Sequence, residues 1–398
     1  MKRNEISHHV FPSRLPPLSH KGRGETAGFS LVELLVGIAV AMLLMLLVTD
    51  VYSNAVWRQR DVAGGSDAQK TASISLFQIT NMLKQAGSAS GPAWNAWGCK
   101  LQAKKSSTTL LPLSAALPDP FKTLPTTLRL APVLVYATAV APSSRESDMV
   151  LLMASDFNAV GLPFKLLVKP ASDTLSLANS NGLLVNDLLL TTQKNNEVCT
   201  ITQVKSDYTL TYSGGKLDPT PHTVAVGGDY AYTNALATLA ANDVVYGLGR
   251  APHFNVYGVD PLDSSLKTYD LLQTHGVTAP TAIAENVFLL KALYGVDTDG
   301  DNNVNSWVSP QSSGWRFTEL SANTETARKQ LAKIKAIRIA LVTRGSYPGV
   351  NRYAATLSLF ASVGGQTQTF NLTDAERRYR YQVHESVIPL FNVKTLDE

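Results

Sequence analysis

Residues 28–48 read GFSLVELLVGIAVAMLLMLLV, a glycine followed by a run of 20 mostly apolar residues at positions 29–48. A helix of ~20 residues is ~30 Å long, which is the thickness of the hydrocarbon core of a bilayer. Glu33 is the only charged residue in the run. A carboxylate in an apolar spanning helix costs ~2.5–3.5 kcal/mol to insert, so Glu33 is expected to have a partner or a function.

Three interpretations of this segment differ in how much they explain. A secretory signal has an apolar core of ~7–15 residues followed by a small-residue cleavage site, for which residues 53–55 (SNA) are a faint candidate. The run is too long for that core, and Asp50 lies before the candidate site. A plain transmembrane anchor explains the length alone. Cleavage after Gly28 explains the junction, the length and Glu33 together.

A glycine, an aromatic residue and a glutamate five residues after the glycine resemble the N-terminal motif of the type IV pilin and pseudopilin superfamily. The resemblance implies that residues 1–28 are a leader, cut by a prepilin peptidase between Gly28 and Phe29. It implies N-methylation of Phe29, and an ion pair between Glu33 and the Phe29 amine of a neighbouring subunit during assembly. Major pilins usually have a proline at the position of Asp50, so its absence implies a specialised subunit.

The distribution of charge agrees with a membrane anchor and gives no sign of nucleic-acid binding. The net charge is +4, and residues 1–28 contain five Lys or Arg and two Glu, so the rest of the chain carries only +1. The basic leader lies on the side that the positive-inside rule makes cytoplasmic. A nearly neutral body lacks the electrostatic footprint that nucleic-acid partners require.

Two cysteines, Cys99 and Cys199, follow the apolar run. An even count in an exported domain favours one disulfide, although two unrelated buried thiols remain the alternative.

The pattern of the remaining chain predicts an α+β fold. Residues 29–86 form one long helix, of which 29–48 is transmembrane and 49–90 is the periplasmic half with the turn that ends it. The adjacent glycines at 64–65 predict a kink or a loosened turn. A helical stripe is expected to pack on a mainly antiparallel sheet within a globular domain at 91–398; its members are Ala72, Leu76, Ile79, Leu83 and Ala86.

Short apolar runs bounded by turn residues predict the strands of that domain, while residues 103–145 are a poorly patterned connection. A hairpin turn is predicted at 260–265 and a short helix at 324–335. The predicted strands are 149–154, 164–168, 183–192, 198–204, 253–259, 266–272, 283–296, 337–343, 353–363 and 379–390.

Later stretches resemble the PilW-type minor pilins, in the order in which they occur in that family: 147–151 (SDMVL), 294–301 (YGVDTDGD), 377–383 (RRYRYQV) and 387–392 (VIPLFN). The resemblance implies a minor pilin in a tip complex that initiates type IV pilus assembly and supports twitching motility and adhesion. Its implied partners are other minor pilins, the major pilin and a tip adhesin. The implied location is the inner membrane, crossed once with the C-terminal domain in the periplasm, and then the pilus tip.

An acidic loop offers a candidate calcium site, because side-chain oxygens recur on alternate residues, as hard cations require. The standard EF-hand pattern is broken, since Asn302 and Val308 replace its glycine and glutamate. A solvated acidic turn is the alternative. The candidate ligands are Asp297, Asp299, Asp301, Asn303 and Asn305.

The sequence predicts no enzyme. It has no H-E-x-x-H motif, and the serine at 345–349 (GSYPG) is misplaced for a nucleophile elbow. Two non-catalytic rivals share the N-terminal chemistry: a minor pseudopilin of a type II secretion system, and a pilus-tip adhesin module that uses residues 100–280.

Overall fold

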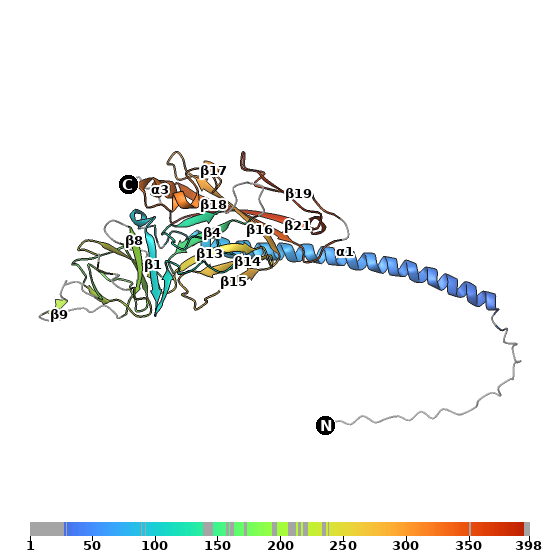
Figure 1. Ribbon diagram of the computed structural model, residues 1–398, viewed down its shortest axis with the longest axis horizontal. Helices are drawn as coiled ribbons and strands as arrows, with labels where there is room; N and C mark the ends of the chain where they lie inside the picture. The colour runs from blue at the N-terminus through green and yellow to red at the C-terminus, as the bar shows by residue number, and fades with distance from the viewer. Residues whose placement is uncertain are drawn as a thin grey trace, which may run out of the picture. The chain divides into compact units, whose positions relative to one another are not determined.

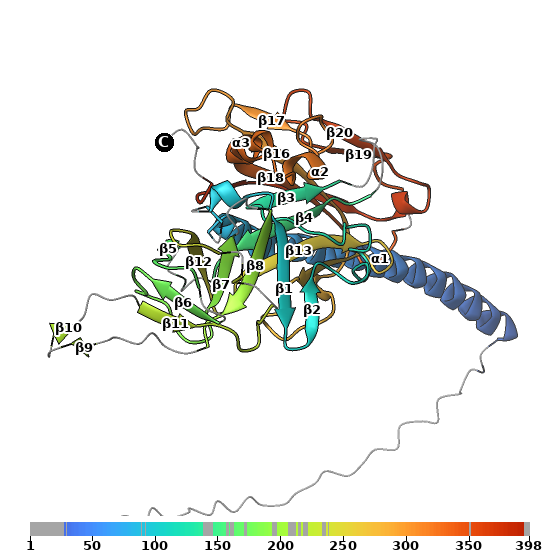
Figure 2. The same cartoon turned by 60° about the vertical axis from the view of Figure 1, so that its left-hand side comes forward.

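A computed structural model gives the arrangement of the elements (Figures 1 and 2). It describes residues 28, 30–88, 90–91, 93–137, 146–156, 159, 163–170, 173–192, 197–205, 212–213, 216–217, 222–232, 236–237, 239–349 and 352–393. The predicted leader at 1–27 and Phe29 lie outside these residues. The chain forms two compact units, Met1–Val56 and Trp57–Glu398, which are described separately.

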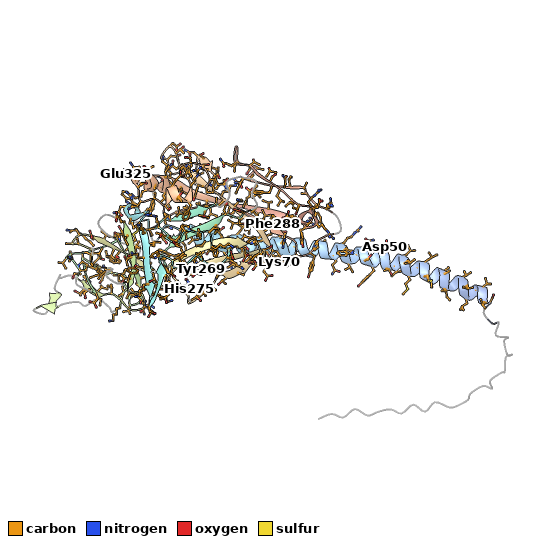
Figure 3. The ribbon with its side chains drawn as sticks, viewed as in Figure 1. Asp50, Lys70, Tyr269, His275, Phe288 and Glu325 are labelled. Carbon is orange, nitrogen blue, oxygen red and sulfur yellow. A yellow bond between two sulfur atoms is a disulfide. The ribbon has the colours of Figure 1, made fainter. Side chains whose placement is uncertain are left out.

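The first element is α1, Leu31–Gln85, a helix of 55 residues. In the unit Met1–Val56 every side chain from Leu31 to Val48 is exposed, and the side chains around Asp50 project from all sides of the helix (Figure 3). Among the described residues, α1 is the helix that is long and apolar enough to cross a membrane.

The C-terminal part of α1 packs on the globular unit through the predicted stripe. Ala72, Ile79, Leu83 and Ala86 are completely buried, and Leu76 packs against the same core while partly exposed. The side-chain amide of Asn392 donates hydrogen bonds of 3.3 Å to the carbonyls of Lys84, Gln85 and Ala86. These carbonyls end the helix, where the helix itself supplies no i+4 donors, and the Gln85 carbonyl also accepts from the Ser88 N–H at 3.0 Å.

α1 continues without interruption through Gly64 and Gly65, so the two glycines do not break the helix, and the expected kink stays a prediction. Both are covered by the globular unit. A Cβ added to Gly64 would lie 3.7 Å from Cα of Gly345, and one added to Gly65 would lie 3.7 Å from the guanidinium of Arg380. The glycines therefore bring the helix close to the chain that follows it, and tertiary packing maintains their helical conformation.

Two antiparallel sheets share the main core with α1. One has the order β15-β14-β13-β4-β3, with β3 Val133–Tyr136, β4 Met149–Ala154, β13 His253–Asp260, β14 Ser265–Asp270 and β15 Thr281–Ala284. The other has the order β17-β16-β18-β21, with β16 Val287–Val296, β17 Ser306–Val308, β18 Ile334–Arg344 and β21 Tyr381–Pro389.

The strand predicted at 283–296 is wrong as a single strand. β15 pairs with β14, whereas β16 pairs with β18, so the chain passes from one sheet to the other at residues 285–286. Asn286 has a φ of 59°, a left-handed conformation that breaks an extended run and that asparagine tolerates. An apolar run alone cannot reveal such a transfer.

A third sheet has the order β2-β1-β8-β7-β12-β5, and its β1–β8 pair is parallel while the others are antiparallel. Its strands are β1 Lys100–Lys105, β2 Thr108–Leu111, β5 Pro163–Lys165, β7 Leu188–Thr192, β8 Val198–Gln203 and β12 Val244–Gly249. The connection predicted at 103–145 thus contains β2, β3 and the second half of β1. These strands are short, so alternation is too brief to predict them.

A second, smaller core lies in the region of β5, β7 and β12, beside the pair β6 (Thr174–Leu177) and β11 (His222–Ala225) (Figure 2). It is enclosed by side chains such as Phe164, Leu189 and Val224. This second core is distinct from the core that contains α1.

The remaining elements are short. The predicted helix at 324–335 is α3, Glu325–Ala332, whose N-cap Thr324 accepts a hydrogen bond from the Ala327 N–H. The pair β19–β20 shares a third core with one face of the four-stranded sheet. The other elements are η1 Trp94–Ala96, β9 Tyr212–Ser213, β10 Lys216–Leu217, α2 Phe317–Leu320, β19 Thr356–Leu359, β20 Gln368–Asn371 and η2 Glu376–Arg378. The fold is α+β, with a long helix on mainly antiparallel sheets, as predicted.

Candidate functional site

The N-terminal segment places Glu33 in the first turn of α1. The N–H groups of Glu33 and Leu34 donate to the carbonyl of Ser30, at 2.9 and 3.1 Å, and so begin the helix. The positive end of the helix dipole favours a carboxylate in this turn. Gly28 lies before it in exposed, non-helical chain, while its predicted cleavage partner Phe29 lies outside the described residues.

The exposed surface of this segment determines what can cover it. The described side chains from Leu31 to Val48 include 14 exposed large hydrophobic residues, with exposed fractions between 46% and 75%. Burial of apolar area contributes ~25 cal/mol per Å², so a surface of this size is stable only against lipid or other apolar helices. The segment can therefore anchor the chain in a membrane or pack in a helical assembly.

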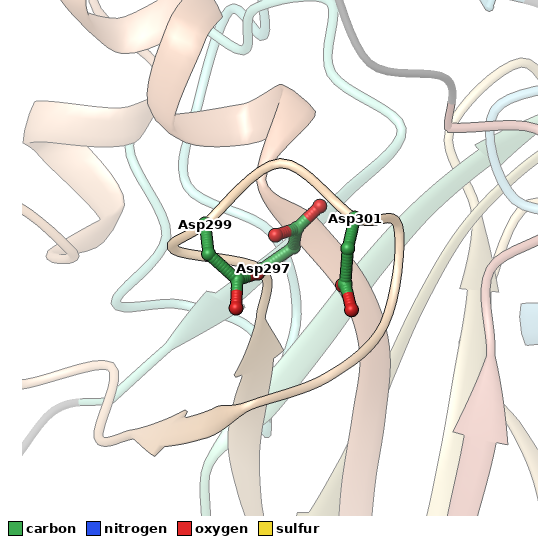
Figure 4. Close-up of side chains that lie close together, drawn as sticks. All are labelled: Asp297, Asp299 and Asp301. Atoms are coloured by element: carbon green, nitrogen blue, oxygen red, sulfur yellow. The ribbon is translucent and has the colours of Figure 1, made fainter.

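The acidic loop lies between β16 and β17, and it brings three of the five predicted ligands together. One carboxylate oxygen from each of Asp297, Asp299 and Asp301 lies within 4.8 Å of the others (Figure 4). Asp299 and Asp301 are exposed, whereas Asp297 is 2% exposed.

Asp297 also organises the loop itself. Its two oxygens accept hydrogen bonds from the N–H groups of Gly300, at 2.7 Å, and Asn302, at 2.8 Å. Burial, the largest single cause, raises the pKa of Asp297, but the two N–H donors, a hydrogen bond with Asp299 and the charge of Lys335 together hold the pKa below the ordinary value. The carboxylate is therefore held in its charged form.

The two predicted asparagine ligands form hydrogen bonds within the loop. Asn305 Oδ1 accepts from the N–H and hydroxyl of Thr298, and Asn303 donates its amide to the Asp301 carboxylate at 3.0 Å. This bond, the largest cause, lowers the pKa of Asp301. The loop thus presents the oxygens of the three aspartates to a hard cation, and calcium binding stays a prediction.

A disulfide joins Cys99 to Cys199, closing a sequence separation of 100 residues. Cys199 lies in β8, beside Leu101 of β1, and both cysteines are completely buried. Cys99 directly precedes β1, so the bond ties the beginning of β1 to β8, the strand that pairs with it.

Sequence reasoning missed a buried ion pair at the joint between β4 and β16. Lys291 Nζ lies 3.0 Å from Asp148 Oδ1, both side chains are 3% exposed, and Asp148 Oδ2 accepts from the Ala292 N–H. Burial raises the pKa of Asp148 while Lys291 lowers it, with burial the larger cause. The signal that could have been noticed is a single lysine in the otherwise apolar strand 287–296.

Comparison with known proteins gives a match within the sheet-rich unit. Residues 255–392 match the family model described as type IV pilus-assembly protein W. The match covers β13 to β21, including the acidic loop and Asn392. No curated protein and no solved structure matches the chain. The match supports a protein related to type IV pilus assembly, in agreement with an envelope protein that carries an apolar N-terminal helix.

Proposed function

We propose that this chain is a minor pilin that helps to initiate type IV pilus assembly within a tip complex. The observation that carries the proposal is Glu33 in the first turn of α1, within its fully exposed apolar part from Leu31 to Val48. The match at 255–392 gives independent support.

Assembly follows from the chemistry of the N-terminal segment. A prepilin peptidase cleaves between Gly28 and Phe29, and the amine of Phe29 becomes methylated. The helix is first covered by inner-membrane lipid and then by the helices of neighbouring subunits. In that low dielectric an unpaired Glu33 is heavily penalised, and the Phe29 amine of a neighbour neutralises it. The pair therefore favours insertion in one register.

The other subunits in the proposed assembly are further minor pilins, the major pilin and a tip adhesin. The sheet-rich unit lies in the periplasm before assembly and at the pilus tip afterwards. Its role is structural, and no catalytic step is proposed.

The test is the variant Glu33→Ala, with Glu33→Gln as a matched control that keeps the size of the side chain. Both variants are expected to lose the leader normally, because the peptidase acts at Gly28, and both should be absent from sheared pili. Leader removal is followed by mass spectrometry and incorporation by immunoblotting. Wild-type incorporation of Glu33→Ala would refute the assembly role of this residue.

Deletion of the gene separates this proposal from a pseudopilin of a type II secretion system. Surface pili should be lost while enzyme secretion remains, and the wild-type gene should restore the pili. Intact pili with failed secretion would assign the chain to the secretion machinery.

An adhesin role is a second candidate, favoured by the separate core formed around Phe164, Leu189 and Val224. It predicts that pili still form without this protein but no longer attach cells to a surface.

A further inference from the structure

The strand β21 forms an edge of the four-stranded sheet that differs from the other sheet edges. In the part of the chain that the structure describes, the other outer strands of the three larger sheets have only three or four residues each; they are β2, β3, β5, β15 and β17. β21 has nine residues, and its register with β18 is continuous without a bulge. Native proteins usually protect edges by shortness, bulges, lysine or proline. β21 has only Pro389, at its end.

The hydrogen-bond pattern shows which backbone groups face outward. The N–H of Gly345 donates to the carbonyl of Arg380, and the N–H of Leu390 donates to the carbonyl of Lys335. Both are directly opposed pairs in the register of β18 and β21, so even-numbered residues of β21 are the hydrogen-bonded partners of β18. The backbone groups of Val383, Glu385 and Val387 consequently point away from β18.

These outward groups have no hydrogen bond to any described residue. Pro389 is the last of the odd-numbered, outward-facing positions of β21. Because proline has no N–H, the row of outward donors ends before it. The edge is a row of backbone donors and acceptors that are not used within the described chain, and an extended strand can pair with all of them at once.

We propose that the free edge of β21 binds an extended strand from another protein subunit, which adds a fifth strand to this sheet. That the partner is a pilus subunit rests on the proposed function.

The side chains on the same face define the chemistry of the partner strand. Val383 is 37% exposed and Val387 is 50% exposed. Between them Glu385 keeps its negative charge, and its carboxylate accepts from Arg338 at 2.6 Å and from the N–H of Phe360 at 2.6 Å. The partner therefore carries apolar residues four positions apart, to meet the two valines, with a polar or cationic residue between them.

A second copy of this chain fits this edge less well. An antiparallel pair of β21 strands that places Val383 opposite Val387 of the other copy also places the two Glu385 residues opposite each other. Like charges directly opposed in a sheet are destabilising. The edge is therefore suited to a different sequence.

The contacts between β21 and α1 show which helix an added strand would lie beside. The Gln382 side chain donates to the carbonyl of Gly65 at 3.2 Å, and Asn392 caps the end of α1 at residues 84–86. The roughly ten residues from Gln382 to Asn392 span ~33 Å as a strand, and the roughly twenty residues from Gly65 to Lys84 span ~30 Å as a helix. These matching lengths, with contacts at both ends, place this part of α1 along the whole of β21 (Figure 1). A strand added to β21 runs beside the helix that carries the assembly segment.

The test compares proline with alanine at the outward positions of the full-length chain. Val387→Pro and Val383→Pro remove an outward N–H without breaking the ladder to β18, whereas Val387→Ala and Val383→Ala keep the N–H. Incorporation into sheared pili is measured relative to wild type, with melting temperature and leader removal as checks of folding and processing. A lost hydrogen bond of ~1 kcal/mol is worth about fivefold, so each proline variant should incorporate at least about fivefold less, and each alanine variant should be affected less than its proline counterpart.

A second variant keeps the test decisive if proline perturbs the fold. Val383→Lys/Val387→Lys retains all N–H groups and places charges on the edge, with Leu262→Lys as control, because Leu262 is 85% exposed in the turn between β13 and β14. The double variant should lose incorporation about fivefold or more, and Leu262→Lys should not. Incorporation within twofold of wild type for the double variant would overturn the proposal.

Three further results also decide it. Equal losses from alanine and proline would overturn strand pairing in favour of a simple apolar contact. A concentration-dependent dimer of the detergent-solubilised chain, seen by light scattering and abolished by Val387→Lys, would overturn the choice of a different partner. Loss of incorporation in Glu33→Ala with normal incorporation of the edge variants would overturn this inference alone and leave the proposed function standing.

Discussion

The two parts of α1 have the same secondary structure in opposite surroundings. From Leu31 to Val48 every side chain is exposed, while further along Ala72, Ile79 and Leu83 are completely buried. The first part is apolar all round, as suits lipid or a bundle of helices, and the second has one apolar stripe against a sheet. The comparison shows that one continuous helix can join two surroundings when the width of its apolar surface changes along its length.

The largest expected effect concerns the globular unit alone. Replacing both Cys99 and Cys199 by alanine should lower its free energy of unfolding by about 4 kcal/mol, since a loop of ~100 residues has a chain-entropy value near ~4.7 kcal/mol. Urea unfolding followed by tryptophan fluorescence, to which the buried Trp97 contributes, measures this. The helical circular dichroism of the apolar segment in micelles should survive. Its loss would contradict the separation of the two parts.

A pair of leucines tests the contrast directly. Leu83→Ala should lower the free energy of unfolding by about 3 kcal/mol, because it removes a completely buried side chain from the main core. Leu44→Ala, at a position 57% exposed, should change it by less than about 0.5 kcal/mol. Equal effects in the same urea titration would show that the exposed part also packs on the globular unit.

Calcium should act on the globular unit and leave the apolar segment unchanged. At a concentration 100-fold above the Kd, binding to the acidic loop would add ~2.7 kcal/mol, and extracellular modules have Kd values of ~10⁻⁴–10⁻³ M. Melting temperatures in EDTA and in ~10–100 mM calcium, which is 100-fold above such Kd values, measure the effect. Asp299→Asn/Asp301→Asn should abolish the effect, because it removes two of the three carboxylates. The loop should keep its shape, because Asp297, which organises it, is unchanged. An identical melting temperature in both buffers would reject a stabilising ion.

The smallest expected effect comes from the glycines at the start of the packed part of α1. Gly64→Ala should raise the free energy of unfolding by about 0.5–1 kcal/mol, since alanine favours helix and the new Cβ meets atoms no closer than 3.7 Å. Gly91→Ala is the opposite control, because its Cβ would lie 2.6 Å from the carbonyl oxygen of Asn392. A destabilising Gly64→Ala would indicate that the helix must loosen there.

The amino-acid sequence alone was enough to predict the features that depend on residues close together in the chain. The apolar run with Glu33 and the stripe ending at Ala86 follow from helical periodicity, so α1 could be bounded to within two residues. The hairpin at 260–265 and the helix α3 depend on local turn and capping residues, and both were predicted. The acidic loop was recognisable because its oxygens alternate along a short segment.

Features that depend on distant parts of the chain were decided by tertiary structure. The transfer between sheets at Asn286 and the pairing of β1 with β8 depend on partners far away in sequence. The short strands in 103–145 carry too little alternation to indicate them. The Asp148–Lys291 pair and the continuous helix at Gly64–Gly65 depend on what the folded chain places beside them. The free edge of β21 is likewise a property of strand order, because a sequence specifies that a strand forms but only the assembled sheet decides which strand lies last.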